Sequence, residues 1–161
     1  MTPRPWDDLV SRANADARQP ILFLPGPPRS ALVVWDRWAE TFGEAGYVAL
    51  IPEWPLGQGA GASPDDVAQA AAHFARLARA LSSRPAIVGY GVAGRVAEAL
   101  GLDGVSAATV VILSRPSVQA GPQKNEPSPE RAGPLLVTVD TGDAFTRPAA
   151  QQALVFIQRF V

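Results

Sequence analysis

Short runs of consecutive apolar residues alternate along the chain with longer segments in which apolar residues recur every three or four positions. The short runs are typical of buried strands, and the longer segments are typical of amphipathic helices. The short runs predict strands at residues 21–24, 47–51, 86–89, 109–113 and 135–139. The helical spacing predicts helices at residues 6–17, about 35–44, 65–81, about 92–100 and from 148 onward. Strands and helices therefore alternate over most of the chain.

This alternation predicts an α/β fold of the doubly wound class. Parallel strands must be joined by crossover connections, and right-handed crossovers place helices on both faces of the sheet. The chain has 161 residues, of which 47% are hydrophobic and 18% charged, so it can bury a sizeable core. We therefore expect a single domain over residues 1–161.

Residues 114–134 have a different composition from the rest of the chain. They contain five prolines, two glycines and a run of polar residues, and no helical or strand periodicity. Such a segment cannot bury enough apolar surface to form a core. We expect an exposed, proline-rich loop between the fourth and fifth strands.

Charge and composition exclude several classes of function. Fourteen basic and fifteen acidic residues give a net charge of −1, which disfavours binding to nucleic acid. The chain has no cysteine and a single histidine, His73, so neither a metal site nor a cofactor is expected. The N-terminal residues Arg4, Asp7 and Asp8 are unlike a signal peptide, and no apolar run reaches the roughly 18 residues of a membrane span. We expect a cytoplasmic protein that does not associate with a membrane.

Three segments together resemble the α/β-hydrolase superfamily. Residues 20–28, PILFLPGPP, are similar to the strand and turn that carry the oxyanion loop. Residues 35–55 resemble the first helix, the following strand and a proline-rich turn. Residues 65–100 place the sequence GYGVAG where the family has its nucleophile elbow. The resemblance implies a reduced hydrolase core without a lid, with a mostly parallel five-stranded sheet in the order 2-1-3-4-5.

The residues that would perform hydrolysis are missing from this resemblance. The nucleophile position of the elbow is Gly91, and His73 lies within a predicted helix rather than after the last strand. Pro25 and Gly26 replace the His-Gly of the oxyanion loop, and the following Pro27 has no backbone N–H. We therefore expect no catalytic residue and interpret the chain as a pseudoenzyme. The lone histidine is most simply an ordinary surface residue.

An acidic member of the catalytic triad is the one part that the resemblance retains. Asp140 and Asp143 follow the fifth strand, where the family often carries this acid. The sequence Asp-Thr-Gly-Asp is also typical of a turn, which is the simpler interpretation of both residues.

The resemblance also implies a crevice at the point where the strand order reverses, between the first and third strands. We expect this crevice to bind a small molecule or a protein partner. The predicted lining residues are Pro25, Gly26, Pro27, Arg29, Trp54, Tyr90, Gly91 and Val92. The two aromatic residues in this set are equally consistent with simple packing.

Two alternative functions remain open at this point. Gly89, Gly91 and Gly94 form the pattern G-x-G-x-x-G between a strand and a helix, which is typical of dinucleotide-binding proteins. These glycines and Arg115 would then form an anion site, with Arg115 near a 2′-phosphate. The other alternative is an enzyme that uses the same crevice, either a hydrolase with an unrecognised nucleophile or a catalyst that works by positioning alone.

Overall fold

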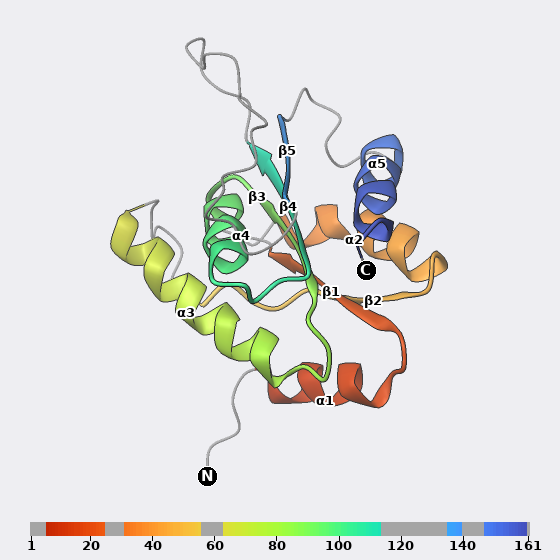
Figure 1. The fold of residues 1–161 in the computed structure, drawn as a ribbon, viewed down its shortest axis with the longest axis horizontal. Helices are drawn as coiled ribbons and strands as arrows, with labels where there is room; N and C mark the ends of the chain where they lie inside the picture. Colours follow the sequence, from red (N-terminus) through yellow and green to blue (C-terminus); the bar gives the residue numbers. More distant parts are fainter. Residues whose placement is uncertain (1–5, 25–30, 56–62, 114–134, 140–146, 161) are drawn as a thin grey trace.

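The computed structural model describes residues 6–24, 31–55, 63–113, 135–139 and 147–160, which form a twisted parallel sheet with helices on both faces (Figure 1). The strands are β1 (Gln19–Leu24), β2 (Tyr47–Leu50), β3 (Ala86–Tyr90), β4 (Ala108–Leu113) and β5 (Leu135–Val139). Their order is β2-β1-β3-β4-β5, and each neighbouring pair is parallel. The predicted α/β class and the parallel sheet are confirmed.

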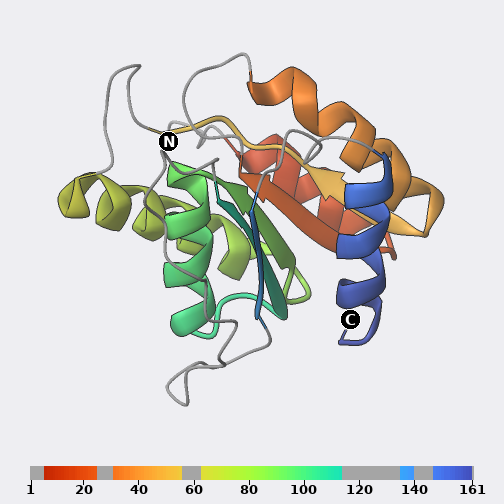
Figure 2. The ribbon, with the colours of Figure 1, turned by 90° about the horizontal axis from the view of Figure 1, so that it is seen from above.

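The helices form one layer on each side of the sheet (Figures 1 and 2). One layer contains α1 (Asp7–Ala15), α3 (Pro64–Ala80) and α4 (Val92–Leu102), and the other contains α2 (Ala31–Glu44) and α5 (Arg147–Gln158). Successive strand residues point to opposite layers, so Leu22 packs beneath the first layer and Phe23 beneath the second. Both are fully buried, which explains why the strands are continuous apolar runs rather than alternating ones.

An aromatic cluster fixes α2 to the sheet. The ring of Phe23 lies 5.2 Å from that of Trp35, 6.3 Å from that of Trp38 and 5.5 Å from that of Phe42, measured between centroids. The sequence prediction placed the start of this helix near Trp35, but the helix begins at Ala31. The buried aromatic stripe begins one turn after the backbone becomes helical, so periodicity alone placed the boundary too late.

Local signals set the start of α3. The side chain of Ser63 accepts a hydrogen bond from the N–H of Asp66 at 3.1 Å, and Pro64 occupies the first turn. Serine is among the best N-cap residues. Proline is tolerated at the first helical position because a backbone N–H there would have no acceptor within the helix. The helix therefore begins where the sequence predicted it, within one residue.

Two side chains attach the N-terminal segment to the end of α3 and to the chain that follows it. Asn14 donates to the carbonyl of Ala80 at 3.0 Å and accepts from the N–H of Ser82 at 2.7 Å. Gln19 donates to the carbonyl of Arg84 at 2.6 Å. These contacts hold α1 and the start of β1 against the segment that leads into the central strand β3.

Candidate functional site

The connection between β3 and α4 is a sharp turn near the centre of the sheet. Tyr90 ends β3, Gly91 is the N-cap residue, and Val92 begins α4. Gly91 has φ 60° and ψ −121°, a backbone conformation that residues with a side chain rarely adopt. The chain therefore passes from strand to helix through a single residue, as predicted for the elbow, although β3 extends one residue further than the sequence indicated.

Gly89 allows the first turn of α4 to cross closely over β3. A Cβ atom at this position would collide with the carbonyl oxygen of Ala93 and would lie 2.7 Å from its carbonyl carbon and 2.9 Å from the N atom of Gly94. These are backbone atoms, which cannot rotate away. The N–H of Gly94 donates to the carbonyl of Gly91 at 3.0 Å and closes the turn. A glycine within a strand is the sequence signal for such a close approach.

The N-terminus of α4 has no side-chain cap. Gly91 has no side-chain oxygen to accept hydrogen bonds from the first amides of the helix, whereas Ser63 provides one for α3. Gly91 is partly exposed, while Gly89 and Gly94 are buried. Gly91 therefore contributes no side chain to the surface at the start of α4.

The two aromatic residues predicted to line the crevice pack on opposite faces of the sheet. Trp54, in the segment after β2, is half-buried against the layer of α1, α3 and α4, with its ring 5.9 Å from that of Phe74. Tyr90 packs against the other cluster, beneath α2 and α5. Each side chain therefore packs against a different helical layer.

Trp54 has a second property that no sequence pattern signals. Its Nε1 atom is buried and has no hydrogen-bond partner within the described ranges. An indole nitrogen can only donate, and leaving a buried donor unsatisfied costs about 1–3 kcal/mol. Because Trp54 follows β2, this donor lies in a segment that leaves the carboxyl edge of the sheet.

His73 lies on α3 rather than at the β3–α4 turn. It is half-buried, and its ring meets that of Phe74 edge to face at 5.2 Å. The side chain is partly exposed and partly packed against Phe74. Burial lowers the pKa of His73, and the nearby positive charge of Arg76 lowers it further. No hydrogen bond or ion pair joins His73 to another residue in the described part of the chain, so the structure gives it no nucleophile to activate.

Several predicted site residues lie outside the described residues. They are Pro25, Gly26, Pro27, Arg29, Arg115, Asp140 and Asp143, together with the predicted loop at 114–134. Of the predicted site, the structure therefore places Trp54 and the residues of the β3–α4 turn.

The described ranges also contain no group of three or more histidine or acidic residues arranged to hold a metal ion. None of their helices combines the length and the apolar character that crossing a membrane requires. A scan against protein-family models found no match, and searches of curated proteins and of solved structures found none either. The function is therefore inferred from the geometry of the β3–α4 turn.

Proposed function

We propose that the chain is a reduced α/β-hydrolase core without a lid, which has lost hydrolytic activity and binds a small molecule or a protein partner at the carboxyl edge of its sheet. The observation that carries this proposal is Gly91, with φ 60° and ψ −121° at the N-cap of α4. In the hydrolase fold the nucleophile occupies a strained turn of this kind between a strand and a helix. Here the backbone of such a turn is present without a nucleophilic side chain.

The chemistry of the remaining residues supports the loss of activity. A general base contributes typically 10² to 10⁴ in rate, and His73, the single histidine, packs on Phe74 instead. A missing oxyanion-hole donor costs roughly a further 10² to 10³, and Pro27 has no N–H to donate. A hydroxyl at position 91 would therefore lack both its base and part of its electrostatic support.

The position of the turn supports a binding role. β1 lies between β2 and β3 in the sheet, so the strand order reverses between β1 and β3. Ligands of open α/β sheets bind at such a reversal. Gly91 contributes no side chain at this edge, and no described side chain caps the first amides of α4. The unsatisfied indole N–H of Trp54 is a donor that a ligand with an acceptor group would satisfy.

Activity and binding assays test the two parts of the proposal. We expect the wild type neither to hydrolyse activated esters above the buffer rate nor to react with a fluorophosphonate probe. Saturable turnover that disappears in His73→Ala would overturn the loss of activity, since it would require a nucleophile that His73 reaches.

For binding, a thermal-shift screen compares acyl ligands with nucleotides, because a ligand that binds only the folded state raises the melting temperature. We expect an acyl ligand to stabilise the wild type, and Trp54→Phe, which keeps the ring but removes the N–H, to respond less. Stabilisation by NADP alone would instead select the dinucleotide alternative. A screen in which no ligand shifts the melting temperature would remove the small-molecule part of the proposal.

A further inference from the structure

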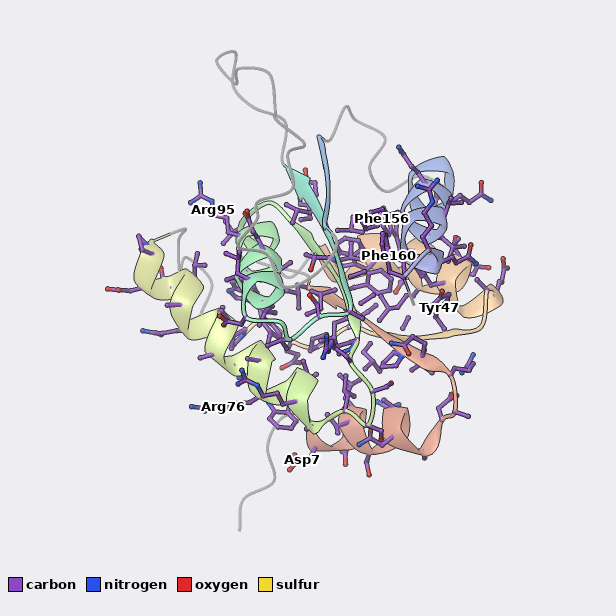
Figure 3. The ribbon with its side chains drawn as sticks, viewed as in Figure 1. Asp7, Tyr47, Arg76, Arg95, Phe156 and Phe160 are labelled. Atoms are coloured by element: carbon purple, nitrogen blue, oxygen red, sulfur yellow. The ribbon has the colours of Figure 1, made fainter. Side chains whose placement is uncertain are left out.

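The outer side of α3 is a continuous exposed stripe. Its residues recur every three or four positions and share one side of the helix, facing away from the sheet. This outer stripe consists of Asp65, Ala68, Gln69, Ala72, Arg76 and Arg79, all exposed. Figure 1 shows α3 on the outside of its layer, and Figure 3 shows Arg76 pointing away from the rest of the fold.

The charges of the outer stripe are separated along the helix. Asp65 lies in the first turn, and Arg79 in the last turn. Neither residue, nor Arg76, forms a hydrogen bond or ion pair with any other residue that the structure describes. The stripe therefore presents a negative end, an uncharged middle and a positive end to solvent.

The spacing of these charges is symmetric about Ala72. Asp65 precedes Ala72 by seven residues, and Arg79 follows it by seven. Two copies of α3 that run antiparallel about a two-fold axis at Ala72 would place each Asp65 opposite Arg79 of the other copy. A parallel pair would instead place like charges together, which is repulsive. Only the antiparallel arrangement is self-complementary, as a two-fold interface requires.

We propose that the outer stripe of α3 is a self-association surface whose occupant is α3 of a second copy of this chain, running antiparallel with Ala72 at the two-fold axis. The alanine side chain at the axis allows the two helices to approach to about 8 Å, the lower end of the usual range for packed helices. The two Asp65–Arg79 pairs set the register.

The helix dipole explains part of this pattern and leaves part unexplained. An acidic residue in the first turn and a basic one in the last turn stabilise any isolated helix. The cost of burying charges places both residues on the solvent side. Neither effect requires the two charges to lie at equal distances from a small residue. Exposed ion pairs contribute little each, so the association is weak and weakens further as salt screens the charges.

Cysteine cross-linking tests the geometry directly, because the chain has no cysteine of its own. We expect Ala72→Cys to form a disulfide-linked dimer under mild oxidation. Ala80→Cys is the matched control on the same helix, since Ala80 is also exposed. In the antiparallel pair the two residues at position 80 are about 24 Å apart along the helix axis, which is far beyond disulfide reach. Equal cross-linking of both variants, or none of Ala72→Cys, would overturn the proposal.

Charge reversal tests the register. In the Ala72→Cys background, we expect Asp65→Arg or Arg79→Asp alone to weaken dimerisation roughly tenfold, and the two together to restore it. Arg37→Asp, which reverses an exposed arginine on α2, is the control and should have no effect. Circular dichroism melting establishes that each variant is folded, because both changes also oppose the helix dipole. A double reversal that dimerises no better than the single ones would refute the proposed pairing.

Discussion

Replacing Gly89 with alanine adds one methyl group at the point where α4 crosses β3. The new carbon would collide with the carbonyl oxygen of Ala93 and approach the N atom of Gly94 to 2.9 Å. Because these atoms belong to the backbone of the first helical turn, the strain can be relieved only by moving α4 relative to the sheet. The substitution therefore perturbs the turn that carries Gly91.

The cost is that of overpacking a buried site, about 1–3 kcal/mol of unfolding free energy. For a chain of this size, 1 kcal/mol shifts the melting temperature by about 2–4 °C, so we expect a decrease of roughly 2–12 °C. Gly43 provides a control of opposite sign. It lies in α2, and no atom lies within 4 Å of the place that a methyl group would occupy, so Gly43→Ala should stabilise by about 0.5–1 kcal/mol through helix propensity.

Thermal melting and urea denaturation of both variants measure these effects, with the urea midpoint expected to move without a change in slope. If Gly89→Ala is as stable as the wild type, or gains stability as Gly43→Ala does, then α4 does not cross β3 as closely as described.

Four further predictions concern single residues. Gly91→Ser should lower stability by roughly 1–3 kcal/mol through backbone strain and remain inert toward activated esters; ester turnover by this variant would contradict the missing base. Folding lowers the pKa of His73, so as pH falls the histidine is protonated first in the unfolded chain. The free energy of unfolding should therefore fall as pH drops below about 6.5, and it should fall less in His73→Gln. NMR titration of the imidazole ring checks that its pKa is lowered in the folded protein. Ser63→Ala should cost about 1 kcal/mol in unfolding free energy by removing the cap of α3, whereas Ser63→Asp should keep most of it; thermal melting of both variants measures the difference. Asn14→Ala removes two hydrogen bonds and should cost about 1–3 kcal/mol; faster amide exchange at Ser82 is the accompanying readout.

The sequence by itself determined the elements and the class of the fold. The apolar runs that became β1 and β3 are buried on both faces. Such runs, alternating with amphipathic helices, have few ways to pack other than a parallel sheet between two helical layers. Ser63 and Pro64 marked the start of α3 through local capping, which needs no tertiary contact. The glycines at positions 89 and 91 marked the sharp turn, since few other residues fit there.

Only the tertiary structure decided how side chains distant in sequence share an environment. Trp54 packs against the layer of α1, α3 and α4, whereas Tyr90 packs against the layer of α2 and α5, and no sequence pattern gave these opposite directions. His73 is half-buried because its ring packs on Phe74 within the helical layer, and helical spacing alone placed it beside the apolar stripe rather than partly within it. The unsatisfied N–H of Trp54 is likewise a property of the folded chain, because burial and the loss of hydrogen-bond partners arise only when elements meet.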